Sequence, residues 1–241
     1  MENLRTDRNR DIRTSTLKLL SSMATRELLN ELSSRCGKEL SQPIIAEAAG
    51  GVDVARRVQA GEPVDIVALA ANVIDKLIAE GNLMVGSRTD LVKSGIGIAV
   101  PKGATRYDVS SEDAVRDAVV ASKSLSYSTG PSGTYLQQLF ERWGIAKSLE
   151  KRIVIAPPGV PVGSLVAKGD CELGFQQMSE LINLAGIDVL GELPPSIQLL
   201  TIFSAGISIT SQSPDAARRV LEYMASPATA ELKRRLGMEP A

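Results

Sequence analysis

The chain has 241 residues, of which 44% are hydrophobic and 23% are charged, and its formal net charge is -1. This length suffices for one large domain or two smaller ones, each with its own core. A nearly neutral chain has no electrostatic basis for binding nucleic acid or an anionic membrane surface, so we expect neither as a partner.

The chain has no histidine and only two cysteines. The lack of histidine excludes the usual zinc ligand, the commonest general base and any Ser-His-Asp triad. Cys36 and Cys171 lie far apart and lack metal-ligand spacing, so we expect two buried, inert thiols, with a disulfide as the alternative. We therefore expect no metal and no cofactor, and any chemistry would depend on carboxylates, Lys, Tyr, hydroxyls and backbone dipoles.

The N-terminal sequence MENLRTDRNRDIRTS alternates in charge and lacks the apolar segment of a signal peptide. We expect residues 1–14 to form a flexible tail. The sequence contains no run of 18 apolar residues, so we expect no membrane insertion. As written, the sequence predicts a cytoplasmic protein, whereas a removed leader or a misassigned start would make it periplasmic.

The first third of the chain alternates short strands with helices. Strands are predicted at 17–20, 44–47 and 65–69. The helices are predicted after SSMAT, with Leu28, Leu29, Leu32 and Cys36 on one face, at about 54–60 and at 73–80. This alternation is typical of a parallel sheet with helices on both faces.

An apolar segment with internal glycines, at 94–104, breaks the rhythm and predicts a strand that bends or crosses between domains. Strands are then predicted at 124–128, 153–156 and 173–176, with helices at 112–121, after 131, at 162–168 and at 178–184. A second strand-like run at 201–210 precedes two closing helices, at 214–224 and about 228–236. Two crossings predict an α/β protein of two lobes, with two mostly parallel sheets flanked by helices and a ligand cleft between them. We assign 15–96 and 205–241 to lobe 1, and 97–204 to lobe 2.

Five turns at the ends of predicted strands share a composition of small, hydroxyl-bearing, glycine or amide residues. They are SSMAT at 21–25, AAGGVD at 48–53, STGPSGT at 128–134, PPGVPVGS at 157–164 and FQQMSE at 175–180. The unpaired N–H groups and the dipole at a helix start bind anions, although Ser and Thr in such turns can also simply cap the helix. Because the carboxyl ends of parallel strands meet at one edge of a sheet, the five turns together favour a cleft that binds an anion. The predicted ligand-binding residues are Ser21, Ser22, Met23, Ala24, Thr25, Arg26, Gly50, Gly51, Val52, Ser128, Thr129, Gly130, Pro131, Ser132, Gly133, Thr134, Gly159, Val160, Pro161, Gln176 and Gln177.

Several segments resemble a known family. LKLLSSMATRELLNEL, AAGGVDVARRVQAGEPVDIVALA, LSYSTGPSGTYLQQLFERWGI, VAKGDCELGFQQ and LEYMASPATAELKRRLGMEP are similar to the periplasmic molybdate-binding-protein family of ABC-transporter solute-binding proteins. The resemblance covers nearly everything after residue 15. It implies a type II periplasmic-binding-protein fold, a small anionic ligand and, for an exported protein, an ABC permease as partner. We expect a monomer.

The chain departs from that family at residues that bind the oxyanion. By matching segments, Ala24 replaces the first serine, Gly51 or Val52 replaces the second, and Gln177 replaces a tyrosine after the late strand. Only PSGTY stays close to the family's turn. The lost hydroxyls and the space left by the glycines favour a di- or tricarboxylate over molybdate or tungstate.

The chain is also similar to the aconitate isomerase branch of this scaffold, which implies proton transfer in an unsaturated tricarboxylate without a cofactor. Such chemistry needs one acid/base group and dipoles that stabilise an enolate-like intermediate. The candidates are Glu47, Asp53, Tyr127 and Glu180. Their structural alternatives are, in that order, a strand-end surface carboxylate, a helix N-cap, a core aromatic and a solvated acid. Arg26 could clamp a ligand carboxylate or could simply be an exposed helix arginine.

Three hypotheses remain open from the sequence. The preferred one is a two-lobed binding protein for a small anion, with a carboxylate favoured over molybdate. The second is an isomerase on the same scaffold. The third is a ligand-sensing regulator domain, whose DNA-binding partner would be another chain because no helix-turn-helix pattern precedes residue 15.

Overall fold

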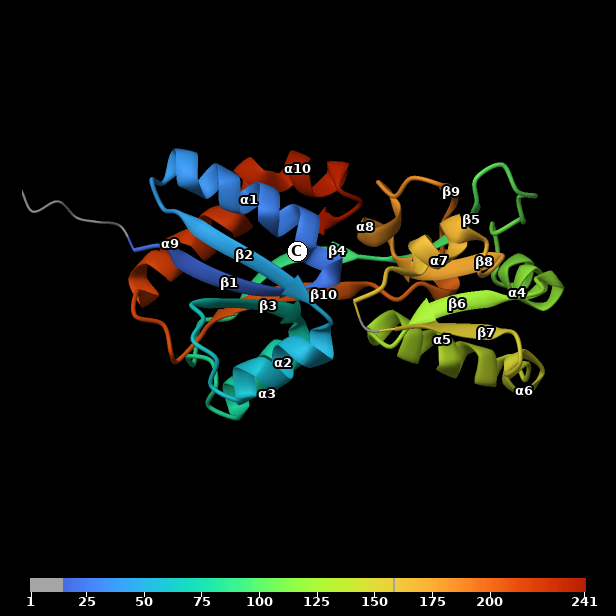
Figure 1. Ribbon diagram of the computed structural model, residues 1–241, viewed down its shortest axis with the longest axis horizontal. Coiled ribbons are helices and arrows are strands. Elements are labelled where there is room, and N and C mark those ends of the chain that lie inside the picture. Colours follow the sequence, from blue (N-terminus) through green and yellow to red (C-terminus); the bar gives the residue numbers. More distant parts are fainter. Residues whose placement is uncertain (1–14, 158) are drawn as a thin grey trace, which may run out of the picture.

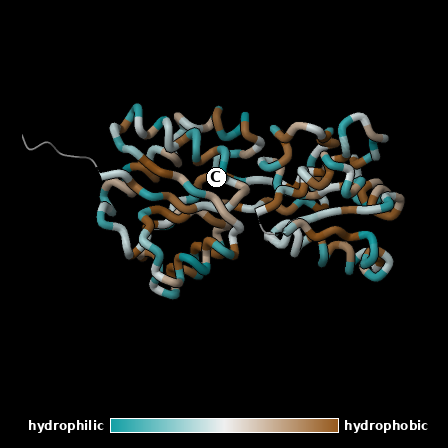
Figure 2. The backbone as a smooth tube through the Cα atoms, viewed as in Figure 1, coloured by the Kyte–Doolittle hydropathy of each residue, from teal (hydrophilic) through white to brown (hydrophobic). Residues whose placement is uncertain are grey.

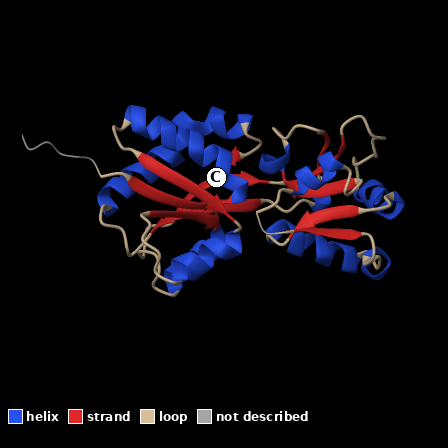
Figure 3. Cartoon of the chain, in the orientation of Figure 1, coloured by secondary structure: helices blue, strands red, loops and turns tan. Residues whose placement is uncertain are grey.

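The computed structural model describes residues 15–157 and 159–241. It contains two β-sheets, each flanked by helices, that lie side by side along the long axis of the molecule (Figures 1 and 3). The α/β architecture with two lobes is therefore confirmed. The N-terminal segment for which we predicted a flexible tail lies outside the described residues. Among the helices that are described, none is both long enough and apolar enough to span a bilayer.

Six strands form the first sheet, in the order β11-β4-β10-β3-β1-β2. They are β1 (Leu17–Ser22), β2 (Ile44–Ala49), β3 (Ile66–Ala70), β4 (Thr89–Ser94), β10 (Thr201–Ile207) and β11 (Glu239–Pro240). β1 pairs in parallel with β2 and β3, whereas β10 pairs antiparallel with β3 and β4, and β11 antiparallel with β4. Parallel pairing is thus confined to the strands of the opening βα units, and this sheet is mixed rather than mostly parallel.

Helices cover both faces of the first sheet (Figure 1). One face carries α1 (Arg26–Glu39), α9 (Pro214–Ala225) and α10 (Ala230–Arg235). The 3-10 turn η1 (Met23–Thr25) leads from β1 into α1, and η3 (Pro227–Thr229) joins α9 to α10. The other face carries α2 (Gly51–Gln59) and α3 (Ala71–Ala79). Neighbouring side chains of β1 point to opposite faces, so Leu19 packs into the α1 core and Leu20 into the α2 and α3 core. A strand buried on both faces reads as a continuous apolar run.

Five strands form the second sheet, in the order β7-β6-β8-β5-β9. They are β5 (Ile96–Pro101), β6 (Leu125–Ser128), β7 (Ile153–Ala156), β8 (Leu173–Gln177) and β9 (Ile187–Glu192). β6 pairs in parallel with β7 and β8, and β5 pairs antiparallel with β8 and β9, so this sheet is also mixed. Its helices are α4 (Glu112–Ala121), α5 (Pro131–Arg142) and α6 (Ala146–Leu149) in one apolar cluster, and α7 (Val162–Lys168) and α8 (Met178–Leu181) in another.

The apolar residues concentrate along the strands and on the inner faces of the helices of each sheet (Figure 2). We call the six-stranded sheet with its helices the first lobe, and the five-stranded sheet with its helices the second lobe. The residue boundaries that we assigned to the lobes stay a prediction.

The chain passes between the lobes twice. It leaves the first sheet after β4, turns at Gly95 and enters the second sheet as β5, so the strand predicted within 94–104 is β5, and β4 ends at the first residue of that segment. A Cβ on Gly95 would lie 2.6 Å from Nε2 at the end of the Gln198 side chain, whose Oε1 accepts from the Ile96 N–H over 2.8 Å. The return runs from β9 through η2 (Pro195–Ile197) to β10. Sequence patterns did not identify β4 or β9, because both are short strands that mix charged with apolar residues.

Candidate functional site

The first two predicted turns lie next to each other at the end of the parallel strands of the first lobe. A Cβ on Gly51, at the start of α2, would lie 3.9 Å from Ser22 Cβ, at the end of β1. Within the described part of the chain, Ser22 Oγ is buried and has no hydrogen-bond partner. The neighbouring hydroxyls do have acceptors: Ser21 Oγ donates to Glu47 O (3.4 Å) and Thr25 Oγ1 to Ser22 O (3.3 Å). The Ser22 hydroxyl is therefore the one that a ligand could still satisfy.

The turn before α5 brings its backbone into very close contact. A Cβ on Gly133 would lie 1.7 Å from Ser128 O, so only glycine fits this position. The N-cap of α5 is Gly130, which has no side chain that could cap the helix, and the Thr134 hydroxyl donates to Gly130 O (3.4 Å) instead. Ser132 is buried in the first turn. Side-chain capping, the alternative interpretation of these hydroxyls, is therefore not their role at the N-cap of this helix.

Two of the predicted ligand-binding residues, Val52 and Val160, are exposed apolar residues. Val52, in the first turn of α2, is 75% exposed, and Val160, before α7, is 37% exposed. Gly159 adopts a φ of +78°, in the left-handed region that favours glycine.

A cavity of about 240 Å³ lies between the two lobes beside α8. Five of the predicted ligand-binding or catalytic residues line it: Met23, Ala24, Arg26, Pro161 and Glu180. The remaining lining residues, which sequence analysis missed, are Glu27, Ser179, Asn183, Leu184 and Ala185.

The structure does not bring the other predicted ligand-binding residues into this cavity, so their contact with a ligand stays a prediction. They are Ser21, Ser22, Thr25, Gly50, Gly51, Val52, Ser128, Thr129, Gly130, Pro131, Ser132, Gly133, Thr134, Gly159, Val160, Gln176 and Gln177.

Two hydrogen bonds join the lobes at this cavity. Ser179 Oγ donates to Ala24 O over 2.9 Å, and Asn183 Nδ2 donates to Glu27 Oε2 over 3.2 Å. Both donors belong to the α8 segment, and both acceptors lie at the start of α1. Ser179 and Asn183 follow Gln176 at helical spacing. This spacing was the sequence signal that could have indicated these contacts.

Glu180 is the one catalytic candidate that faces the cavity, and its environment is unusual for a carboxylate. Burial raises the pKa of Glu180 to about 7, although a hydrogen bond from Gln176 and the positive charge of Arg26 both lower it. Gln176 Nε2 donates to Glu180 Oε1 over 2.7 Å. A carboxyl group with a pKa near neutrality can both accept and return a proton at physiological pH.

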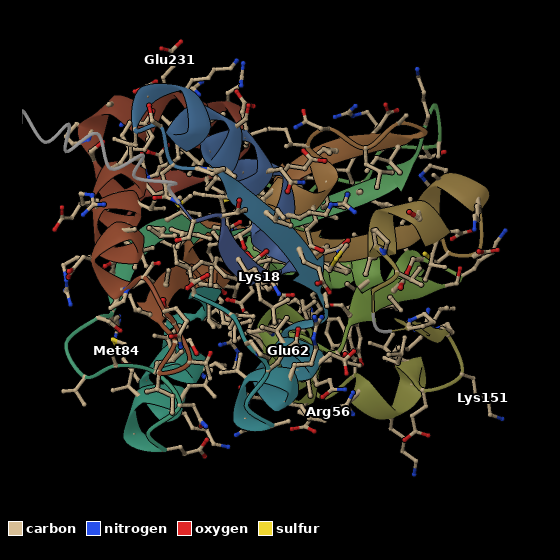
Figure 4. All side chains as sticks on the ribbon, turned by 60° about the vertical axis from the view of Figure 1, so that its left-hand side comes forward. Lys18, Arg56, Glu62, Met84, Lys151 and Glu231 are labelled. Atoms are coloured by element: carbon tan, nitrogen blue, oxygen red, sulfur yellow. The ribbon has the colours of Figure 1, made fainter. Side chains whose placement is uncertain are left out.

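The other three catalytic candidates make structural contacts elsewhere. Arg57 donates to Glu47 over 2.5 Å and lowers the pKa of that exposed carboxyl. Asp53 pairs with Arg56 over 2.6 Å on the outer side of α2, where Figure 4 shows Arg56 at the surface. Tyr127 is buried in the second-lobe core, with its ring 6.2 Å from that of Phe140. These positions match the structural alternatives that the sequence left open for Glu47 and Tyr127.

Gln177, predicted as a ligand-binding residue, lies at the crossing between the lobes. Its amide is buried between Thr201, at the start of β10, and the backbone of Ser94 and Gly95. The carbonyls of Ser94 and Gly95 can only accept, so the amide nitrogen must face them (3.1 and 3.3 Å), and its oxygen accepts from Thr201 Oγ1 (3.0 Å). The Gln177 side chain therefore binds both inter-lobe connections.

The two cysteines are buried and unpaired, which confirms the predicted thiol state. Burial raises the pKa of each thiol to about 11. Among residues 15–157 and 159–241, no three His, Cys, Asp or Glu side chains gather closely enough to hold a metal ion.

Comparisons with known proteins agree with the two-lobed α/β fold. A family model described as "Bacterial extracellular solute-binding protein" matches residues 17–239. The chain is 35% identical to an aconitate isomerase of Pseudomonas sp over 232 residues, which cover 94% of this chain and 88% of that protein. It is 17% identical to the molybdate-binding protein ModA of Escherichia coli (strain K12), over 87% of this chain and 83% of that protein. The solved periplasmic molybdate-binding protein of Azotobacter vinelandii has a TM-score of 0.77 at 18% identity, over 92% of this chain and 98% of that chain. The predicted family resemblance is confirmed.

Proposed function

Because the chain belongs to the bacterial extracellular solute-binding protein family, we propose that it binds a small di- or tricarboxylate between its lobes and isomerises it by proton transfer. The observation that carries the proposal is Glu180, a carboxyl group with a pKa of about 7 that lines the inter-lobe cavity together with Arg26. The 35% identity to an aconitate isomerase supports the same reaction class.

Arg26 supports a carboxylate as the ligand. It stands at the start of α1, lines the cavity and makes no ion pair with any described residue, so its guanidinium is available to a ligand carboxylate. Ser22 offers a buried hydroxyl without a partner, which a further carboxylate oxygen could satisfy. Gln177 stands at the position of the family's oxyanion-binding tyrosine. Its amide hydrogen-bonds to the two inter-lobe connections, which argues against a molybdate-type ligand set.

The proposed reaction is a 1,3-proton shift within an unsaturated tricarboxylate. The Glu180 carboxylate takes a proton from the saturated carbon next to the double bond, and the C–H electron pair becomes an allylic carbanion conjugated with a substrate carboxylate. The proton then returns to the far end of the allylic system, and the double bond moves by one position. Every atom and electron is conserved, so no oxidant, reductant or cofactor takes part. Donors such as Arg26 stabilise the enolate-like charge.

A second candidate function is a receptor that binds the same class of anion without turnover and delivers it to an ABC permease. The family description and the molybdate-binding relative favour this candidate. Such a receptor would act outside the cytoplasm.

The first experiment is a thermal-unfolding screen against molybdate, tungstate, sulfate, citrate and the two aconitates. A ligand at 100 times its dissociation constant adds about 2.7 kcal/mol to the free energy of unfolding, which is readily measured. We expect a carboxylate to stabilise the protein, and stabilisation by tungstate alone would contradict the proposed ligand class. The Arg26→Ala variant should weaken binding, and unchanged affinity would mean that the ligand lies elsewhere.

The second experiment separates enzyme from receptor. Aconitate incubated with the protein in heavy water should exchange carbon-bound hydrogen, as followed by proton NMR. The Glu180→Gln variant should bind aconitate but lose the exchange. Binding without exchange by the unmodified protein would favour the receptor function.

A further inference from the structure

We infer that Gln176 is a positioning residue, which holds the Glu180 carboxylate by Oε1 and leaves Oε2 as the atom that takes up and returns the proton. This inference rests on the proposed function, because it assumes that Glu180 is the acid/base group. Gln176 itself does not line the cavity and need not touch the substrate.

The Gln176 side chain is held at both ends. It is 2% exposed and lies near the end of β8. Its Nε2 donates to Glu180 Oε1 over 2.7 Å, and its Oε1 accepts from the backbone N–H of Gly163, in the first turn of α7, over 3.4 Å. The carboxylate needs a donor and the N–H needs an acceptor, so the two contacts fix the orientation of the amide. Gln176 thereby connects α7 to the first turn of α8.

This geometry makes the two oxygens of Glu180 different. The amide NH₂ group has no lone pair that could receive a proton, and it occupies Oε1 whether the carboxyl group is ionised or neutral. Oε2 accepts no hydrogen bond from any residue that the structure describes. A proton taken from a substrate is therefore expected on Oε2. The other charged groups that line the same cavity are Arg26 and Glu27, and neither hydrogen-bonds to Glu180.

A buried glutamine could instead be needed only for packing and for the Gly163 N–H group. The two roles differ in their effect on the ionisation of Glu180. A hydrogen-bond donor stabilises the carboxylate over the carboxylic acid, so its removal must raise the pKa of Glu180. A packing role would alter stability without moving that pKa.

The test is the Gln176→Met variant, which keeps most of the side-chain volume and removes the donor. From the usual strength of a hydrogen bond to a charged group, we expect the Glu180 titration midpoint to rise by roughly 1 to 2 pH units, measured by carbon-13 NMR of labelled glutamate. The Glu180→Gln variant assigns the signal. The acidic limb of the kcat/KM profile should move by the same amount, so that activity falls roughly 10- to 100-fold at pH 6 and recovers at higher pH.

Gln177→Met is the matched control, because the adjacent glutamine does not contact Glu180; it should leave the NMR midpoint unchanged. If Gln176→Met does not fold, Gln176→Glu replaces it, and the two neighbouring carboxyl groups should then titrate in two separated steps. An unshifted midpoint in Gln176→Met, or a single shared step in Gln176→Glu, would overturn the inference. The NMR measurement needs no turnover, so the absence of hydrogen exchange in the unmodified protein would reject the proposed function while leaving this test intact.

Discussion

Replacing Glu180 by glutamine should stabilise the protein at neutral and alkaline pH. Burial raises the pKa of Glu180 from its ordinary value of 4.5 to about 7. Between these values the folded state binds more protons than the unfolded state, so this group lowers the free energy of unfolding as pH rises. At about 1.36 kcal/mol per pH unit, the full effect above pH 7 is about 3 kcal/mol, as an upper bound. In the Glu180→Gln variant, the neutral side chain at position 180 can still accept a hydrogen bond from Gln176, and it places no ionised group in the cavity.

Urea unfolding of both proteins at several pH values between 4 and 8.5 measures this effect. The difference in unfolding free energy between Glu180→Gln and the unmodified protein should be smallest near pH 4. It should increase through the window from 4.5 to 7 and stay constant above it. Glu231→Gln is the control, because Glu231 is exposed and projects outward from α10 (Figure 4). A difference for Glu180→Gln that does not change with pH would refute the reasoning from burial.

Three further predictions follow from contacts in the two lobes. Gly133→Ala should destabilise the protein by roughly 1–3 kcal/mol or more, since its Cβ would lie 1.7 Å from a backbone carbonyl oxygen; Gly130→Ala, whose nearest contact is 3.5 Å, should change urea stability by less than about 1 kcal/mol. Gln177→Met should lower the unfolding free energy by roughly 1–3 kcal/mol, because it removes the buried hydrogen bonds of the Gln177 amide to Ser94, Gly95 and Thr201; unchanged urea stability would contradict the assigned contacts. Cys36 and Cys171, whose pKa values are raised to about 11, should resist a thiol reagent at pH 8 until guanidinium unfolds the chain, and rapid reaction of the folded protein would contradict their burial.

The sequence predicted the βα units well because their signals are local. The apolar runs of β1 and β3 are buried on both sides, and the serines Ser21 and Ser22 mark the end of β1. The crossings were harder to predict. The predicted segment at the first crossing contains β5 but not β4, and Gln198, which hydrogen-bonds to Ile96 there, is more than 100 residues away. The partner that decides such a position is not visible in a local pattern.

The candidate site was predictable in its location and only partly in its residues. The turn at Ser22 and the position of Arg26 follow from strand-to-helix spacing alone. Glu180 was one of four equal candidates. An acid in the first turn of a helix is normally solvated, so nothing in the sequence favoured Glu180 over the other three. The first lobe packs against α8 through the Ser179–Ala24 hydrogen bond, which lies at the same cavity as Glu180. Gln177 shows the opposite case: a polar residue at a strand end that suggested a ligand contact hydrogen-bonds to both inter-lobe connections.

The proximity of Arg26 to Glu180 also predicts that ligand binding is coupled to proton uptake. The charge of Arg26 lowers the pKa of Glu180, so an anion bound to Arg26 would offset that effect and raise the pKa of Glu180 further. With a pKa of about 7, Glu180 is partly ionised at pH 7 without ligand, so binding should take up a fraction of a proton at this group. Isothermal titration calorimetry at pH 7 in two buffers of different ionisation enthalpy measures the uptake directly. Glu180→Gln should abolish it while retaining binding, whereas proton release by the unmodified protein would mean that the ligand does not approach this pair.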